Sequence, residues 1–398
     1  MKFALARKLA KPLAWALAAG SLVHPLATWL ARLDWRADLV AHFREPALAL
    51  SLLAAAAMAR VRRPVAVGLG LLALGQGWGL ALCSWPNPVP PDSRSLAGLR
   101  VLLANVLVEN EDRDALVRLI RREQPGVVGV LELSRGWSET LEAVRRDYPH
   151  RYEFPDDDSG RGIGLYLRLR PLSVEFIPAL APGGMPAIHA LIEFDGRPRH
   201  LWLVHLVSPF ERPAGLPLGR EFDALAARVR EHGGSTLVLG DLNTTDGSPH
   251  FGRFLASSGL RDSRLGFGRQ PSWPAWSPYR IALDHAFLSP DLAVRGRRLG
   301  PAIGSDHFPL ILDVAPARES RKPTAQPSQS STDFGDSPAN LARSASRRNS
   351  ISRSESSGPS RPEGAGSAAI SSVVFDAQAG PKAAIRASRT PSEAAISR

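Results

Sequence analysis

Polar residues that could activate a water molecule follow several apolar runs of this sequence. One run continues as Gly-Asp-Leu-Asn, which places Asp241 and Asn243 on the same side of one strand end. A carboxylate and a carboxamide in that arrangement could hold a water molecule against a phosphorus atom. Further along, a Gly-Ser-Asp-His segment adds Asp306 and His307.

Four more apolar runs end in residues that can bind a metal, a phosphate or water, namely Asn105, Glu132, His205 and Asp284. One Asn, Glu or His at a strand end is usually a turn or capping residue. Turns do not readily explain six such segments in one stretch of chain. We therefore expect the six to cluster at one rim of the sheets.

The elements that must position these residues are short. From residue 99 onward, apolar strands alternate with amphipathic helices, and Ser248 and Pro249 are a cap and a first helical position. Several strands adjoin without a helix between them, which favours packed mixed sheets. The pattern predicts strands at 100–107, 126–133, 163–169, 188–194, 201–206, 236–239, 283–288 and 309–314, and helices at 113–122, 138–146, 219–231 and 249–257.

Three apolar stretches, 13–30, 46–59 and 64–85, precede this region. Spanning a bilayer takes about 20 apolar residues, which the third stretch meets, the first nearly meets and the second does not. We expect residues 1–85 to form a membrane anchor with two to three transmembrane helices. A cleaved signal peptide is the alternative for the first stretch, although no small-x-small cleavage site follows it.

Basic residues predict the orientation of the anchor, because cytoplasmic segments are enriched in Lys and Arg. If both basic groups stay in the cytoplasm, three spans place the rest of the chain outside. The expected location is the inner or plasma membrane, with the soluble domain on the periplasmic or extracellular side. The two groups are Lys2, Arg7, Lys8 and Lys11 before the first stretch, and Arg60, Arg62 and Arg63 before the third.

Composition separates the remaining regions. Residues 86–98 form a Pro-rich linker, and residues 317–398, rich in Ser, Arg, Pro and Ala, are predicted to be disordered. The net charge of +11 is concentrated at the two ends, so the nearly neutral middle gives no evidence for a long polyanionic substrate. The single cysteine, Cys83, excludes an internal disulfide and a thiolate zinc cluster.

In sequence and spacing, the six segments resemble the endonuclease/exonuclease/phosphatase superfamily, the group of deoxyribonuclease-like phosphodiesterases. The resemblance covers residues 99–314, and its most specific parts are Gly-Asp-Leu-Asn and Ser-Asp-His. The apolar stretches resemble those of bacterial members with a three-span anchor. The resemblance implies an α+β fold over residues 99–316, a four-layer α/β/β/α sandwich with two mixed β-sheets, and metal-dependent hydrolysis of phosphate esters.

The resemblance also implies a metal site. Glu132 would hold a hard divalent cation through oxygen, with Asn105 and Asp306 nearby. Few protein ligands and several waters suit Mg²⁺, with Mn²⁺ as the alternative ion. The sequence here is Val-Leu-Glu, whereas many relatives have Gln directly before the glutamate. This difference removes a neighbouring amide but leaves the metal-binding carboxylate of Glu132 in place.

The remaining residues take catalytic and phosphate-binding roles in this reading. Asp241 would orient and deprotonate the attacking water, and Asn243 would hold that water or the phosphate. His307 would stabilise the pentavalent state, kept cationic by Asp284. His205 would bind the phosphate from the other side, and Asn105 is a further phosphate contact.

Other polar groups are ambiguous in sequence. His285 either packs beneath the site or occupies a position that differs among relatives with different substrates. The acids at 156–158 are expected to form a solvated turn. The glycines at 160–164 lead into a strand, so they are not a dinucleotide-binding loop. A serine or cysteine hydrolase is disfavoured, because there is no Gly-x-Ser-x-Gly elbow.

The leading function is therefore a membrane-anchored, Mg²⁺-dependent hydrolase of nuclease or phosphodiesterase type, with no obligate protein partner. The loop carrying Trp273, Trp276, Tyr279 and Arg280 could stack a nucleic-acid base. It could equally rest on lipid headgroups, and a phospholipid or sphingolipid phosphodiesterase is the alternative. A catalytically silent anchored interaction module is a third possibility.

Overall fold

A computed structural model describes residues 2–85, 98–211, 217, 219–317 and 373–375. The predicted linker, apart from Gly98, lies outside the described residues. So does the predicted disordered tail, apart from Ala317 and the short strand β13 (Val373–Phe375), which pairs antiparallel with β5 (Pro171–Ile177).

The first of two mixed sheets has six strands, in which β1 and β2 are parallel and all other neighbours are antiparallel. Its parallel strands are buried on both faces, as their unbroken apolar runs predict. In spatial order the strands are β11 (Leu292–Leu299), β12 (Leu310–Pro316), β1 (Leu99–Asn105), β2 (Val127–Leu131), β4 (Ile163–Leu167) and β3 (His150–Phe154).

The second sheet has six strands between residues 171 and 288, with β13 added at its edge. Here β7 and β8 are parallel, and β8 pairs antiparallel with β10. In spatial order the strands are β13, β5, β6 (Ala187–Phe194), β7 (Arg197–His205), β8 (Thr236–Asp241), β10 (Asp284–Leu288) and β9 (Arg261–Asp262).

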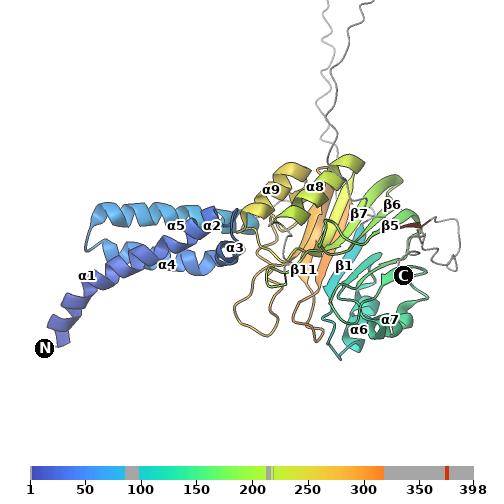
Figure 1. Ribbon diagram of the computed structural model, residues 1–398, viewed down its shortest axis with the longest axis horizontal. Coiled ribbons are helices and arrows are strands. Elements are labelled where there is room, and N and C mark those ends of the chain that lie inside the picture. The colour runs from blue at the N-terminus through green and yellow to red at the C-terminus, as the bar shows by residue number, and fades with distance from the viewer. Residues whose placement is uncertain (1, 86–97, 212–216, 218, 318–372, 376–398) are drawn as a thin grey trace, which may run out of the picture. The chain divides into compact units, whose positions relative to one another are not determined.

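The two sheets pack face to face between outer helices (Figure 1). Residues such as Leu103 and Leu203 fill the core between the sheets. A second apolar cluster lies beneath α6 (Asp114–Glu123) and α7 (Arg135–Leu141), and a third beneath α8 (Arg220–His232) and α9 (Pro249–Ser258). The predicted α+β four-layer sandwich is therefore confirmed.

Most predicted elements are present within a few residues of their expected ends. In α9, the Ser248 hydroxyl accepts from the His250 backbone N–H at 3.2 Å, as the predicted cap requires. The helix expected at 138–146 begins earlier, because the Ser134 hydroxyl caps α7 by accepting from the Trp137 N–H, and it ends in the 3-10 turn η2 (Glu142–Val144). The prediction missed β3, β5, β9 and β11, and it assigned the residues of β13 to the disordered tail.

Five helices occupy most of residues 2–84. The first stretch is α1 (Lys2–Ser21) followed by α2 (Val23–Leu30), and the third is α5 (Arg63–Ser84). The second stretch is α4 (Arg44–Met58). A short helix that the sequence analysis did not predict, α3 (Trp35–Ala41), precedes it and meets it at 68°. Two helical segments, Leu9–Leu30 and Arg63–Ser84, are long and apolar enough to cross a membrane, or three if the bent pair is one span.

Candidate active site

Strand pairing brings the predicted site residues together at one rim of the sandwich. Asn105 ends β1 and Glu132 follows β2, which lies parallel beside β1. In the second sheet, the register pairs Asp241 with His205 on one side and with Asp284 on the other. The rim that the six segments predicted is therefore built from both sheets.

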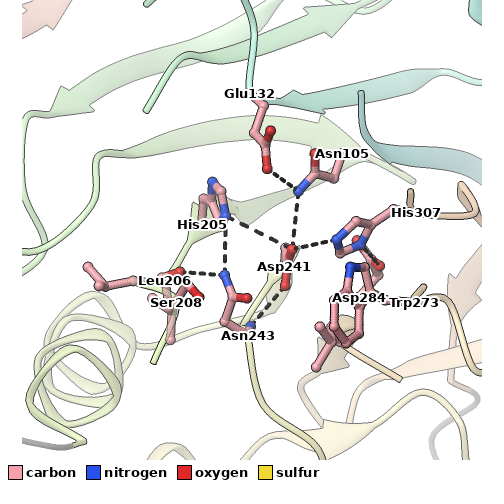
Figure 2. A network of polar contacts seen from close by, with 12 residues as sticks. Asn105, Glu132, His205, Leu206, Ser208, Asp241, Asn243, Trp273, Asp284 and His307 are labelled. Atoms are coloured by element: carbon pink, nitrogen blue, oxygen red, sulfur yellow. Dashed lines mark hydrogen bonds and ion pairs between the residues drawn. The ribbon is translucent and has the colours of Figure 1, made fainter. Parts of the chain in front are cut away.

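Asp241 is the residue on which the contacts converge (Figure 2). Its Oδ1 accepts from the backbone N–H of Asn243 at 2.8 Å, and its Oδ2 accepts from Nδ2 of Asn105 at 3.2 Å. Two imidazoles face the same Oδ2, with Nε2 of His307 at 3.5 Å and Nε2 of His205 at 3.9 Å. One carboxylate is thereby oriented from four directions.

A glycine makes the position of Asp241 possible. Gly240 lies against the neighbouring strand β7, and a Cβ at this residue would overlap the carbonyl oxygen of Val204. The Gly-Asp order in the motif therefore has a packing reason, since only glycine lets β8 approach β7 this closely.

Asn243 adopts the left-handed conformation with a φ of 49°, and Glu132 does so with a φ of 60°. Non-glycine residues rarely adopt this conformation, and such positions concentrate at functional sites. The Asn243 carboxamide donates to the carbonyl of Leu206 at 2.9 Å, and its Nδ2 lies 3.3 Å from Nε2 of His205. Asn243 and His205 thus form one polar wall beside Asp241.

His307 lies between two buried carboxylates. Its Nδ1 is 2.8 Å from Oδ2 of Asp284, and its backbone N–H donates to the Ser305 hydroxyl at 3.0 Å. Burial would lower the pKa of His307, but the charges of Asp284 and Asp241 outweigh it and raise the pKa to about 10. The ring is therefore an imidazolium near neutral pH.

Burial shifts the other two central groups toward their neutral forms. It raises the pKa of Asp241 to about 7, against the opposing charge of His307. It lowers the pKa of His205 to about 4, and the charge of His307 adds to this effect. A carboxylate with a pKa close to neutrality is suited to exchanging a proton with water.

The residues predicted to hold a metal fit a hard cation. Glu132 accepts from Nδ2 of Asn105 at 2.8 Å and from the backbone N–H of Val108 at 3.3 Å, and burial raises the pKa of its carboxyl group. Asp306 lines the same cleft and receives the indole N–H of Trp273 at 2.9 Å. Two oriented carboxylates in one cleft are the oxygen ligands that Mg²⁺ prefers.

A second group of potential ligands lies deeper. Asp241, Asp284 and His307 offer ligand atoms within 4.8 Å of one another, and all three are buried. In the present arrangement the His307 imidazolium is itself the cation between the two carboxylates. The more open set around Glu132 is therefore the better place for a metal ion.

The site opens into a cleft of about 410 Å³. Its walls include two residues that the sequence did not indicate, Leu39 of α3 and His42 after it, together with Phe210, which stacks edge-on against Trp35. No local pattern could have identified Leu39 or His42, because only the fold brings the N-terminal helices beside the catalytic rim.

Polar contacts hold these N-terminal residues against the loop that follows Asn243. Nδ1 of His42 lies 3.0 Å from Oγ1 of Thr245, and Arg44 donates to Oδ2 and to the backbone carbonyl of Asp246, both at 2.9 Å. The cleft wall and the loop after Asn243 are therefore directly connected.

The aromatic loop serves the site and the N-terminal helices. Trp273 orients Asp306, whereas the Tyr279 hydroxyl donates to Oε2 of Glu45 at 3.1 Å and its ring stacks on Phe43. Trp276 is 80 % exposed and is the most accessible aromatic residue of the loop, since Tyr279 is 37 % exposed.

The ambiguous groups lie outside the polar network. His285 is fully buried against Phe251, with Nε2 2.9 Å from the Thr244 carbonyl, so it packs beneath the site. Oδ1 of Asp156 accepts from the backbone N–H groups of Asp158 and Ser159, as a solvated turn requires, and Asp158 lines the edge of the cleft.

Comparison with known proteins agrees with this geometry. A model of the Endonuclease/Exonuclease/phosphatase family matches residues 102–307, just over half of the 398 residues. No curated protein matches the sequence.

Similar solved structures cover just over half of the chain. A humanized form of D. rerio TDP2 is 20% identical over 55% of this chain and 99% of its own, with a TM-score of 0.45. An endonuclease/exonuclease/phosphatase from Bacteroides vulgatus is 18% identical over 56% and 100%, with a TM-score of 0.47. The human Nocturnin catalytic domain is 19% identical over 58% and 100%, with a TM-score of 0.45. From the family match, the chain belongs to the endonuclease/exonuclease/phosphatase family, as a hydrolase of phosphodiesterase or nuclease type.

Proposed function

We propose that the protein is a membrane-anchored, Mg²⁺-dependent hydrolase of phosphoric diesters whose catalytic domain, residues 99–316, acts outside the cytoplasm. The observation that carries the proposal is the environment of Asp241. This buried carboxylate, with a pKa of about 7, is held by Asn105 and Asn243 and faces the His307 imidazolium.

Each residue of the network has a part in an in-line displacement. Asp241 takes a proton from the attacking water, which the Asn243 carboxamide helps to hold. His205 and Asn105 contact phosphate oxygens from opposite sides of Asp241. His307, fixed and kept cationic by Asp284, donates to the oxygen on which negative charge develops.

Glu132, Asp306 and the Asn105 carboxamide would hold the metal ion, with Mn²⁺ as the alternative to Mg²⁺. When bound, the ion offsets negative charge on the phosphate oxygens and on the departing oxygen. The contact from Trp273 orients Asp306 toward this site.

The anchor contacts support the proposed orientation. Ala31 after α2, Arg44 at the start of α4 and Cys83 near the end of α5 all contact the catalytic domain. These helix ends therefore lie on one side, and the basic residues at 60–63 lie at the opposite ends of α4 and α5. The positive-inside rule assigns those basic residues to the cytoplasm.

Two substrate classes fit the cleft. The exposed Trp276 favours a nucleic acid, whose bases stack on aromatic rings. A lipid phosphodiester is the second candidate, and a specific observation favours it. Leu39 of the anchor and the 73 % exposed Phe210 line the cleft, which gives an apolar wall beside the membrane helices.

The test uses the full chain in detergent, assayed on single-stranded DNA and on phospholipid vesicles. We expect hydrolysis that EDTA abolishes and Mg²⁺ restores, and a loss of about 10²- to 10⁴-fold in Asp241→Asn. Asp195→Asn, on the exposed turn between β6 and β7 at the opposite end of β7 from His205, is the matched control. Hydrolysis that is unaffected by EDTA, or equal in the Asp241→Asn variant, contradicts the proposal.

A further inference from the structure

Three histidines from different elements meet on the outer face of the second sheet. His189 lies on β6, His200 on β7, and His232 is the last residue of α8. His200 precedes His205 by five residues on the same strand, which at about 3.3 Å per residue separates them by about 16 Å. The cluster is therefore distinct from the catalytic cleft, and the proposed hydrolysis gives it no role.

The ring nitrogens converge. Nε2 of His189 lies 2.9 Å from Nδ1 of His200, and the cluster offers one ligand atom from each histidine, all within 4.8 Å of one another. Imidazoles bind Zn²⁺ at about 2.0 to 2.1 Å, which separates tetrahedral ligands by about 3.3 Å. His189 and His200 are thus close to the required spacing, and His232 needs the larger shift from an exposed helix end.

His189 is buried and His200 is half-buried, and both rings are in the form that binds metals. Burial, assisted by His232, His200 and Arg228, lowers the pKa of His189 to about 3. Burial and His232 likewise lower the pKa of His200. Both rings are neutral near physiological pH, so a cation does not have to displace a proton from a charged ring.

The surroundings also orient the cluster. Glu175 lies opposite His189 in the β5–β6 register, and its Oε2 is 3.9 Å from Nδ1, the ring nitrogen that points away from His200. Trp202 stacks on His189 with ring centroids 4.2 Å apart. A carboxylate behind a ligating histidine is a common support of zinc sites. The C-terminal end of α8 carries a partial negative charge, which favours a bound cation and offsets the positive charge of nearby Arg228.

We propose that His189, His200 and His232 bind a transition-metal cation, most favourably Zn²⁺, with a water molecule as fourth ligand. The ion would link β6 and β7 to the end of α8. Three imidazoles without a thiolate also suit Ni²⁺ and Cu²⁺, which would compete for the site.

The experiment counts Zn²⁺ ions bound by the full chain in detergent, using calorimetry in excess Mg²⁺. We expect His232→Gln and His200→Gln each to bind one Zn²⁺ ion fewer than the wild type. His150→Gln, a half-buried histidine of β3 in the other sheet, is the control and should bind as the wild type does. Glu175→Gln should weaken the same site by about 10- to 100-fold.

Hydrolysis by His232→Gln should equal that of the wild type, which separates this site from the catalytic one. Because His232 is exposed at a helix end, this variant should fold as the wild type does. A wild-type protein that binds no more Zn²⁺ than His232→Gln overturns the proposal.

Discussion

The central carboxylate and the imidazolium of this site depend on each other. Asp241 is buried and needs a neighbouring cation to ionise, while His307 is buried and needs neighbouring anions to stay protonated. Asp284 is the second anion. Burial would raise its pKa, but the charge and hydrogen bond of His307, together with the Ser272 hydroxyl, lower it. Two carboxylates therefore stabilise one imidazolium, and removing one of these negative charges should have a measurable effect on activity.

Asp284→Asn tests this balance. The amide keeps the shape of the side chain but removes the charge that fixes His307 as an imidazolium. We expect kcat to fall by about 10²- to 10⁴-fold with little change in KM, because the interaction matters most in the transition state. Steady-state kinetics alongside Asp195→Asn measures it, and a kcat equal to that of the control would contradict the assignment.

Trp273→Phe tests the support of the proposed metal site. Phenylalanine keeps an aromatic ring at the cleft but removes the N–H that Asp306 accepts at 2.9 Å. Loss of such a supporting hydrogen bond should weaken Mg²⁺ activation by about 10- to 100-fold. The measurement is the Mg²⁺ concentration that gives half-maximal activity. Trp276→Phe, on the exposed part of the same loop, should leave that concentration unchanged.

Among the secondary-structure elements, the parallel pair β7–β8 determines the geometry of the rim. The register sets His205 opposite Asp241, and the close approach of the two strands at Gly240 holds that register. A one-residue slip would turn Asp241 to the other face of the sheet.

Gly240→Ala should therefore affect both stability and activity. The added methyl group meets the Val204 carbonyl, which is backbone and cannot rotate away. We expect a loss of about 1–3 kcal/mol in unfolding free energy and a lower rate of hydrolysis. Denaturation of the full chain in detergent measures the stability. Gly252→Ala, where a Cβ would contact nothing within 4 Å in α9, should be neutral or stabilising, and equal effects of the two changes would refute the packing argument.

In the whole molecule, the N-terminal helices both contact the catalytic domain and complete its cleft. Arg44 forms an ion pair with Asp246. Glu45 forms an ion pair with Arg269 and accepts a hydrogen bond from Tyr279. Because Leu39 and His42 line the cleft, a domain without these helices would have an incomplete site.

Cysteine labelling can test the proposed orientation of the whole chain. The single native cysteine, Cys83, is buried, so it gives a low background. We expect Trp276→Cys to react with a membrane-impermeant maleimide in spheroplasts, because Trp276 is exposed on the catalytic domain. Arg62→Cys, between α4 and α5, should react only after lysis. The opposite pattern would place the catalytic domain in the cytoplasm.

Much of this fold and site followed from local patterns in the sequence. The apolar runs predicted the buried strands, Ser248 and Pro249 predicted the start of α9, and the polar residues after each run predicted a common rim. These predictions succeeded because burial, capping and strand alternation act between residues that are close in sequence. The missed strands β3 and β11 are edges of their sheet, and charged residues and a glycine interrupt their apolar pattern.

Long-range contacts supplied the rest. The approach of Leu39 and His42 to the cleft, the bond from Trp273 to Asp306 and the meeting of three histidines each join separate elements. No residue type or spacing encodes such a contact locally, because it depends on how whole strands and helices pack. The sequence therefore specified the groups available for chemistry, and the packing of its elements specified which of those groups could act together.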